Sequence, residues 1–518
     1  MADIPRKWWP DCSGISGRLA AEWVADFPRN HRPTSSGICS TSRDPEEIDR
    51  LWQQAQHWIQ SSDIYQEKLF PLQTETDQAI QTTMESLTNS SVRTIGPELI
   101  FGTLFDRLGL ADIPDELFRH LVIARLAYPT SKLKTTDYLY RYKGIRLSVS
   151  ALYHFLDRLH SRYKEAVEQI IYRHTQKHLG SITVVFYDMT TLYFEAEDED
   201  DLHKIGFSKD GKFQHPQIML GLLVGEEGLP IGYDVFEGNT FEGHTLIPTL
   251  TQIKKKYGFN QPVVIADAAM LSNSTLRDLA SQKYKFIIGA RIKTESKEIK
   301  EKILQKATGL KSGDGFVLNR EDGTRLAVTY SEKRAKKDAT NRQKGLSRLE
   351  KRVKSGRMTK ESINNRGYNK FLALEGTMTV KIDEKKVKED QKWDGLKGYI
   401  TNTKFGAKKI AENYSHLWQI EKAFRISKTD LRIRPIHHYR KRRIEAHLCI
   451  SFAAYAIYKE LEMLLKEKGI TMSAKRAGEL TQTMYQLQYT LPDSNETKTQ
   501  ILNMDEAQRT LFNTVHGF

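Results

Sequence analysis

Short apolar runs alternate with amphipathic segments through the middle of the chain, and this order limits the folds open to it. Helices are expected at 244–258 and 273–284, where apolar residues recur at helical spacing. Strands are expected at 183–194, 262–271 and 285–292, and two more within 215–239. Three strands followed by helix, strand, helix and strand predict a mixed α/β sheet.

The first of these strands carries an ionised group in its middle. Ile182–Tyr187 is apolar or β-branched, Asp188 interrupts the run, and Thr190–Phe194 continues it. A lone buried carboxylate costs several kcal/mol unless an opposite charge or a cation compensates it. Asp267 closes a later strand, where an Asp is commonly only a turn or cap residue. Since the sequence shows no cluster of His or Cys, a hard cation with oxygen ligands is the expected partner of Asp188.

A third carboxylate lies in a segment predicted as one long helix at 408–428. With about 3.6 residues per turn, five residues of this helix fall within about 40° of one line: Tyr414, Leu417, Glu421, Arg425 and Lys428. The line borders an apolar stripe, where charge is costly and a site that handles anions would explain it. An ion pair between Glu421 and Arg425 is the alternative, but it leaves Tyr414 and Lys428 without a role. Carboxylates on two strands and a helix suit two-metal phosphodiester chemistry, with two Mg²⁺ ions about 4 Å apart.

The charge of the chain favours a polyanionic partner. Lys and Arg number 79 against 65 for Asp and Glu, so the net charge is +14 and the pI is near 9.3. Such an excess most often serves nucleic acid, although many basic proteins are merely soluble. Ten of the cations lie within 333–354, among them Lys336 and Arg342, which we expect to contact phosphate. A solvated helix face is the alternative for this run.

Cysteine usage and hydropathy indicate a cytoplasmic protein. Cys12, Cys39 and Cys449 are too scattered for a thiolate metal site or a disulfide framework. The apolar run 449–458 is half of the ~20 residues that a membrane helix needs. The N-terminus carries no signal-peptide core. With the positive charge, these features predict a cytoplasmic, nucleoid-associated protein.

The first third of the chain divides into a loop-rich and a helical part. Residues 1–95 are rich in Pro, Ser, Gly and Arg, with weak helical periodicity at 45–60. The pattern of 96–180 is helical, and 135–160 reads as two short helices around a turn, with Ser150 as N-cap. This pair resembles a helix-turn-helix in which Tyr153, His154 and Arg158 face outward. Plain core packing is the alternative.

At the residues of the third carboxylate, the chain resembles the DDE transposases of bacterial insertion sequences. One group of them carries the helical signature Y-x2-R-x3-E-x6-K, and Tyr414, Glu421 and Lys428 stand at its spacing. Leu417 occupies the Arg position, and Arg425 is a candidate for the missing cation. Further similar stretches are GFSKDGK, PQIMLGLLVGEEGLPIGYDVFEGNT, VVIADAAMLS, KWDGLKGYITN and RPIHHYRKRRIEAHL, and together they run from about Val92 to Lys466 in family order.

The resemblance implies an α/β fold: a ribonuclease H-like mixed-sheet catalytic core with a mostly β insertion and a helical N-terminal DNA-binding region. The implied segments are 1–95 (atypical), 96–180 (helical), 181–293 and 396–466 (catalytic core), 294–395 (basic insertion with strands) and 467–518 (helical tail). Asp188, Asp267 and Glu421 would be the catalytic and metal-binding residues, with two Mg²⁺, or Mn²⁺ in their place. The residues implied to contact DNA are Tyr414, Arg425, Lys428, Arg432, Arg434, Lys336 and Arg342.

The activity implied is cut-and-paste transposition. A protein of this family nicks DNA at the ends of its element and joins these ends to target DNA, as a homodimer bound to terminal inverted repeats. Members with the full signature can pass through a DNA hairpin. A catalytically silent DNA-binding relic is the alternative that Leu417 and the unusual N-terminus favour, and a host nuclease on the same fold is a third.

Overall fold

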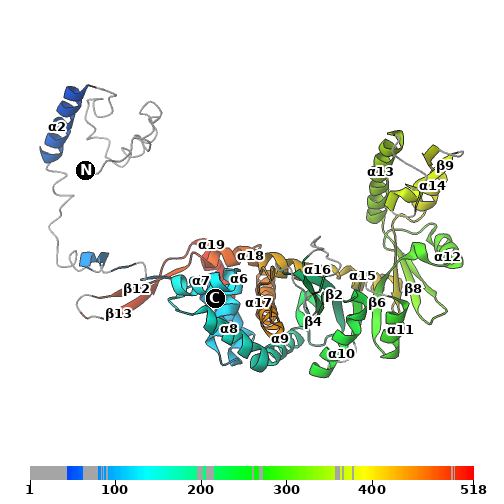
Figure 1. Ribbon diagram of the computed structural model, residues 1–518, viewed down its shortest axis with the longest axis horizontal. Helices are drawn as coiled ribbons and strands as arrows, with labels where there is room; N and C mark the ends of the chain where they lie inside the picture. The colour runs from blue at the N-terminus through cyan, green and yellow to red at the C-terminus, as the bar shows by residue number, and fades with distance from the viewer. Residues whose placement is uncertain are drawn as a thin grey trace. The chain divides into compact units, whose positions relative to one another are not determined.

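The protein forms two compact units, shown in Figure 1, the first of residues 1–87 and 489–498 and the second of 88–488 and 499–518. In the first unit, helix α2 (Pro45–Ser61) confirms the helical periodicity seen at 45–60, whereas the loop-rich stretch 1–43 lies outside the described residues. The computed structural model describes residues 44–61, 80–82, 84–85, 87–88, 91–194, 202, 204–205, 215–258, 262–267, 272–355, 362–364, 367–375, 379–491, 494 and 496–518.

An eight-stranded sheet is the centre of the second unit, with the order β4-β3-β2-β5-β6-β11-β8-β7. Strands β2, β3 and β4 pair in antiparallel fashion, while β5 pairs with β2 and with β6 in parallel. Three antiparallel strands continued by two parallel ones, with β2, the first of these five in the chain, in the middle, form the expected ribonuclease H-like core. The strands are β2 (Val184–Tyr193), β3 (Gln217–Val224), β4 (Pro230–Glu237), β5 (Val263–Ala266), β6 (Lys285–Ala290), β7 (Gly315–Asn319), β8 (Arg325–Tyr330) and β11 (Leu396–Thr401).

Helices cover both faces of this core. Alternate residues of β2 point to opposite sides, so Val185 and Tyr187 pack with helices α10 (Leu246–Tyr257) and α11 (Asn273–Ser281). Val184 and Phe186 face the other side, where α15 (Ala407–Ser415), α16 (Trp418–Arg425) and α17 (Lys441–Glu467) contribute to one large apolar core. By the same alternation, Asp188 lies on the face of α15 to α17.

Helix α17 connects the sheet to the helical region before it. Most of its 27 residues are buried, and it contacts α6, α8 and α9 as well as β4. The helices of this region are α5 (Thr103–Arg107), α6 (Glu116–Ala127), α7 (Lys132–Lys143), α8 (Val149–Arg158) and α9 (Lys164–Leu179). A helix that is apolar all round is buried, and α17 meets this condition between two layers of the same unit.

The helix-turn-helix interpretation of α7 and α8 needs two corrections. Ser148, not Ser150, caps α8, because its side chain accepts a hydrogen bond from the backbone N–H of Ala151. Tyr153 does not face outward: its ring is half-buried and lies edge-on to His438 at 5.9 Å. Arg158 bonds Asp115 at 2.8 Å, so His154 is the exposed residue of the three expected to face outward.

The insertion contains the expected strands but is richer in helix than the resemblance implies. Strands β7 and β8 extend the main sheet beyond β11, and β9 (Leu372–Glu375) pairs with β10 (Thr379–Ile382). The basic run forms the 23-residue helix α13 (Glu332–Lys354), flanked by α12 (Lys297–Ala307) and α14 (Glu384–Gln391). Long Lys and Arg side chains have good helix propensity, which explains why this run is helical.

The predicted long helix at 408–428 is broken. Helix α15 ends at Ser415, α16 begins at Trp418, and a π-helical turn (Ile426–Asp430) follows. On a straight helix Tyr414 and Phe424 would lie about 80° apart, and the break lets both be buried in the same core. Leu417 stands at the break with only 9% of its surface exposed, so the residue at the signature's Arg position is part of the core.

The C-terminal segment is not only helical. Between α18 (Ala474–Thr481) and α19 (Glu506–His516) it forms strands β12 (Tyr485–Thr490) and β13 (Thr497–Ile501). Strand β12 pairs antiparallel with β1 (Val92–Thr94), in a sheet with the order β1-β12-β13. No helix in the described ranges is long and apolar enough to cross a bilayer.

Candidate functional site

The pairing of β2 with β5 places the two candidate aspartates level with each other. Val184 is opposite Val263 and Phe186 is opposite Ile265 in this parallel ladder. Continued by two residues along each strand, the same register sets Asp188 opposite Asp267. Both carboxylates then lie on the face of the sheet that Phe186 and Ile265 share. Asp188 is half-buried within β2 and Asp267 is exposed just beyond β5.

Helix α16 brings Glu421 to the same face. Ile420 and Phe424 of this helix belong to the apolar core that includes Phe186, and α16 contacts β2 and β3. Glu421 itself is exposed. The other acids in reach of a different helix register lie elsewhere: Glu445 is 3.4 Å from Lys164, and Glu412 is 3.9 Å from Lys409 on the surface of α15.

Tyr414 and Lys397 lie near Asp267 and Glu421. The hydroxyl of Tyr414 donates a hydrogen bond of 3.2 Å to Oδ1 of Asp267. The ammonium of Lys397, on β11, lies 4.3 Å from the centre of the Tyr414 ring. The ring of Tyr399 lies 4.9 Å from that of Tyr414 and closes the other side. The tyrosine predicted to grip phosphate is thus held by a predicted metal ligand, and 6% of its surface is exposed.

The pKa values of Tyr414 and Lys397 report the charges around them. Burial raises the pKa of Tyr414, and the negative charges of Asp267 and Glu421 raise it further. Burial and the nearby Arg334 lower the pKa of Lys397, while Asp267 and Glu421 act in the opposite direction. Two residues from different elements therefore sense both carboxylates, as they must if Asp267 and Glu421 belong to one site.

The donor set fits a hard cation. Carboxylate oxygens are the ligands that Mg²⁺ prefers, and Asp188, Asp267 and Glu421 supply them from two strands and a helix. A different group brings three potential ligand atoms within 4.8 Å of one another in the described part of the chain: His174 and His178 of α9 with Glu460 of α17. The aspartates and Glu421 do not form a cluster this close.

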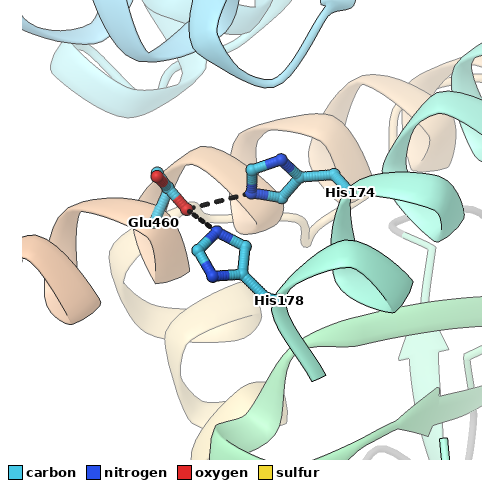
Figure 2. Close-up of side chains that lie close together, drawn as sticks. All are labelled: His174, His178 and Glu460. Carbon is cyan, nitrogen blue, oxygen red and sulfur yellow. Dashed lines mark hydrogen bonds and ion pairs between the residues drawn. The ribbon is translucent and has the colours of Figure 1, made fainter. Parts of the chain in front are cut away.

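Figure 2 shows the imidazoles of His174 and His178 both directed at the carboxylate of Glu460. His174 Nε2 and His178 Nε2 lie 2.9 and 3.2 Å from the same oxygen of Glu460, and Arg107 Nε lies 3.2 Å from the other oxygen. The side chain of Glu460 is 1% exposed. Burial acts to raise the pKa of Glu460, but the two histidines and Arg107 bring it below its usual value. Because these contacts satisfy the carboxylate, the cluster ties α9 to α17.

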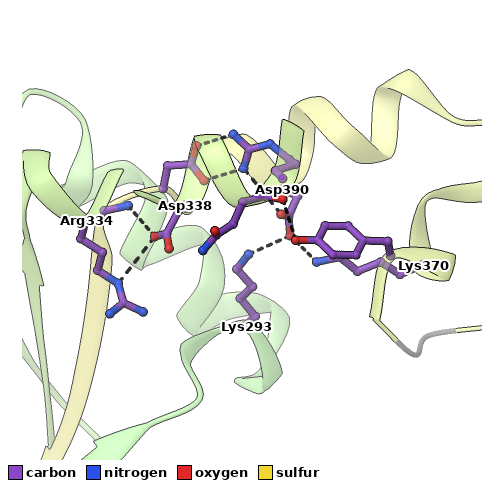
Figure 3. Close-up of polar contacts among 10 residues, drawn as sticks. Lys293, Arg334, Asp338, Lys370 and Asp390 are labelled. Carbon is purple, nitrogen blue, oxygen red and sulfur yellow. Dashed lines mark hydrogen bonds and ion pairs between the residues drawn. The ribbon is translucent and has the colours of Figure 1, made fainter. Parts of the chain in front are cut away.

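A cavity of about 580 Å³ opens beside Asp267, Tyr414 and Lys397 and is bounded by the insertion. Figure 3 shows the polar contacts on its insertion side. Lys293 and Lys370 reach Asp390 at 2.7 and 2.8 Å. Arg334 lies 3.6 Å from Asp338, and both its side chain and that of Asp338 are partly exposed. This wall therefore combines neutralised cations with one, Arg334, that is open to solvent.

The two insertion residues predicted to contact phosphate differ in their surroundings. Arg342 is 7% exposed, makes a two-pronged ion pair with Asp394 and lies 3.8 Å from Asp390. Its guanidinium is thus held inside the insertion, and its contact with phosphate stays a prediction. Lys336, on the same helix, is exposed and pairs with Glu332 at 2.8 Å, a surface pair that water screens.

The remaining predicted phosphate contacts follow Glu421 along the chain. Arg425 is exposed at the end of α16, and Lys428 is partly exposed in the π-helical turn. Arg432 is exposed in the loop before α17. Arg434 stacks its guanidinium on Tyr193, 5.7 Å from the ring centre, and Tyr193 ends the strand that carries Asp188. These four cations therefore lie in the segment of the chain between Glu421 and the start of α17.

Lys397 is the residue of the site that sequence reasoning missed. It lies in the stretch KWDGLKGYITN, which carries the resemblance, but a Lys in a strand normally indicates a solvent-facing position. The spacing of two residues between Lys397 and Tyr399 could have revealed its position. Side chains two residues apart in a strand lie on the same face, and here this is the face that packs against α15 and α16.

Comparison with known proteins identifies the relatives of this arrangement. The sequence model of the family described as "Transposase DDE domain" matches residues 179–457, more than half of the chain. No curated protein matches it. Among solved structures, the chain is similar to the piggyBac transposase synaptic complex with hairpin DNA (10% identity, 74% of this chain and 76% of that chain, TM-score 0.37). It is also similar to the Mos1 transposase paired-end complex with left transposon end (10% identity, 52% and 70%, TM-score 0.16).

The buried pair of Arg342 and Asp394 predicts a large difference between two cations of α13. Arg342→Met leaves Asp394 without its main partner, and we expect a loss of about 2–4 kcal/mol in the stability of the insertion. Lys336→Met, the matched control on the same helix, removes an exposed pair and should change stability by less than about 0.5 kcal/mol. Hydrogen exchange of the α13 amides in the full chain measures both. Equal protection in the two variants would contradict the internal role of Arg342.

The Glu460 cluster predicts a pH-dependent contribution to stability. Because its folded pKa lies below the unfolded value near 4.5, the contribution is complete above that pH and is lost as the pH falls through the folded pKa. We expect Glu460→Gln to be about 1–2 kcal/mol less stable than wild type at pH 7. This difference should shrink in urea unfolding below about pH 4.5. Glu467→Gln, exposed on the same helix, is the control and should match wild type at both pH values.

Proposed function

Because the chain belongs to the family of transposases with a DDE domain, we propose that it cleaves DNA at the ends of an insertion sequence and joins those ends to target DNA in a reaction that requires Mg²⁺. The observation that supports this activity most directly is the level placement of Asp188 and Asp267 on adjacent parallel strands, with Glu421 above the same face. Three carboxylates from separate elements of one core are what two-metal cleavage of a phosphodiester requires.

In the proposed mechanism, the carboxylates of Asp188, Asp267 and Glu421 bind two Mg²⁺ ions, for which Mn²⁺ can substitute. When bound, the metal activates the attacking water or 3′-hydroxyl and stabilises the leaving oxygen. Tyr414 holds Oδ1 of Asp267 through its hydroxyl, which fixes the orientation of this ligand. Lys397 balances the charge of Asp267 and Glu421 before the metal binds.

The surrounding cations are assigned to the DNA backbone. Arg425, Lys428, Arg432 and Arg434 follow Glu421 in the chain. Arg334 lines the insertion side of the cavity, and Lys336 is exposed on the same helix. Contacts of this kind position the duplex without reading its sequence. The partners we propose are the inverted repeats of the element and the target DNA, bound by a homodimer at the nucleoid.

A catalytically silent relic remains the second candidate, and Leu417 is the observation that favours it. In this fold, however, Leu417 is packed in the core at the helix break, and Arg425 lies exposed one turn beyond Glu421. We therefore propose that Arg425 supplies the cation that the signature places at 417. Cleavage activity of the purified chain decides between the two candidates.

The first prediction from this mechanism concerns Asp188. Asp188→Asn should reduce Mg²⁺-dependent cleavage of an end-bearing DNA at least about 1000-fold, because one two-metal ligand is lost, while DNA binding changes less than about twofold. Chelation by EDTA should stop the wild-type reaction, and Mn²⁺ should restore it. Gel analysis of the cleaved strands measures the rate, and fluorescence anisotropy measures binding.

Asp234→Asn is the matched control for this change. Asp234 lies in β4 of the same sheet, is half-buried, and accepts a backbone N–H from the next residue at 2.9 Å, as Asp188 does at 2.8 Å. Its register opposite Gly221 places it on the other face of the sheet. Cleavage should persist in this variant; equal loss in both would show that the sheet, not a metal site, was damaged.

A second prediction concerns Tyr414 as a positioning residue. Tyr414→Phe removes the hydroxyl that holds Asp267, and we expect the Mg²⁺ concentration for half-maximal cleavage to rise about tenfold. Raising Mg²⁺ should recover most of the rate, which a merely unfolded variant would not show. Tyr399→Phe, which keeps the ring against Tyr414, serves as the control with an unchanged Mg²⁺ requirement.

A further inference from the structure

A second cavity, of about 500 Å³, has a wall of cations. It lies between the loop that leads into α7 and the loop that leads into α17. None of the described residues lining it is acidic, whereas eight carry or can carry a positive charge: Arg125, Lys132, Lys134, Arg432, Arg434, His437, His438 and His447. The composition differs from that of the cavity beside Asp267, in which most cations face an acid.

Two of these cations are buried without a counter-charge. Lys132 is 9% exposed, and its ammonium has no hydrogen-bond or ion-pair partner among the described residues. Arg125 is 5% exposed and reaches only the backbone oxygens of Leu431 and Arg432, both at 3.4 Å. Burial, together with the charge of Arg125, lowers the pKa of Lys132 well below its usual value, so a phosphoryl oxygen beside it would stabilise an ammonium that the protein alone disfavours.

The surroundings add to the positive potential. Lys132 begins the 12-residue helix α7, whose N-terminal amide dipoles point toward the cavity lip that Ser131 forms as N-cap. His447 donates from Nε2 to the carbonyl of Ile433, which leaves its buried Nδ1 without a partner. Burial, with Lys132 and Arg125 close by, lowers the pKa of His438 to about 3 and that of His447 well below its usual value. Burial is the largest cause, and it keeps these two imidazoles neutral.

We propose that this cavity is a binding site for a phosphoryl group, with Lys132 and Arg125 as its buried ligands. The helix N-terminus and the two arginines of the opposite loop supply further donors, and a phosphate oxygen would compensate the ammonium that the protein leaves unpaired. The site is separate from Asp188, Asp267 and Glu421, none of which lines it.

A phosphate of the DNA backbone is the source that the position of the cavity favours, and this assignment rests on the proposed function. Arg434 lines the cavity and also stacks on Tyr193 at the end of β2, the strand that carries Asp188. Arg440 and Lys441 are exposed at the start of α17, just after the lining loop. A DNA strand that runs from the three carboxylates along Arg434, Arg440 and Lys441 would reach Lys132. A small phosphorylated molecule shares the same chemistry and is distinguished by the test.

The test compares Lys132→Met with Lys177→Met in the full chain. Lys177 is exposed on α9 and controls for the loss of one charge. Because Met carries no unpaired charge, we expect Lys132→Met to raise the unfolding temperature by about 2 °C or more without ligand. The same variant should bind a 20-base-pair duplex about tenfold more weakly. The slope of log affinity against log salt should fall by about one.

Inorganic phosphate, added at constant ionic strength, distinguishes a phosphate of the DNA backbone from a small phosphorylated molecule as the ligand of this cavity. If it raises the unfolding temperature of wild type but not of Lys132→Met while duplex affinity is equal in both, the site serves a small phosphorylated molecule. If Lys132→Met lowers the unfolding temperature, or binds both probes as wild type does, the phosphoryl site is overturned. Cleavage is not measured here, so a silent catalytic site would leave these outcomes unchanged.

Discussion

The parallel pairing of β2 with β5 is the contact on which the candidate site depends. A strand ladder transmits position residue by residue, so the pairs Val184–Val263 and Phe186–Ile265 determine where the next residues on that face lie. A shift of one residue would turn Asp188 toward α10 and separate it from Asp267. The apolar residues around both aspartates oppose this shift, because it would take Phe186 out of the large core on one face and carry the Asp188 carboxylate into the apolar cluster of Val264 on the other. The register that buries the core therefore also sets Asp188 opposite Asp267.

The break between α15 and α16 is the second condition for the site. The break buries Tyr414 beside Asp267 while Glu421 stays exposed on α16. On one straight helix these two residues would lie on nearly the same line, so the helix could not bury one and expose the other. Leu417 is the residue that packs at the break. Its apolar side chain departs from the family signature, but at this point of the fold an Arg would have to be buried or displace the core.

Local patterns in the sequence were enough to predict most of the core. Alternation and apolar runs gave every strand of the ribonuclease H-like part, and the interrupted strand pointed to Asp188. The features that the sequence did not reveal depend on partners that are distant in the chain. Arg342 is neutralised by Asp394, 52 residues later, and a charge run alone cannot show that one of its members is buried. Strand β12 was missed because its polar sequence becomes a strand only through its pairing with β1. Lys397 was missed because its charge masks its position on an inner face.

The distribution of acids determines which cations of this basic chain remain available to a polyanion. On the insertion side of the first cavity, Asp390 and Asp394 pair with Arg342, Lys293 and Lys370, so these three cations serve an internal network. At the loop before α17 no acid performs this role for Lys132 or Arg125 among the lining residues. Net charge of +14 is thus a poor guide to where DNA binds, since the cations that count are those left uncompensated by the fold. By that criterion the cavity beside Lys132 and Arg125, where we propose a phosphoryl site, differs from the network of Asp390 and Asp394, in which the cations are already paired.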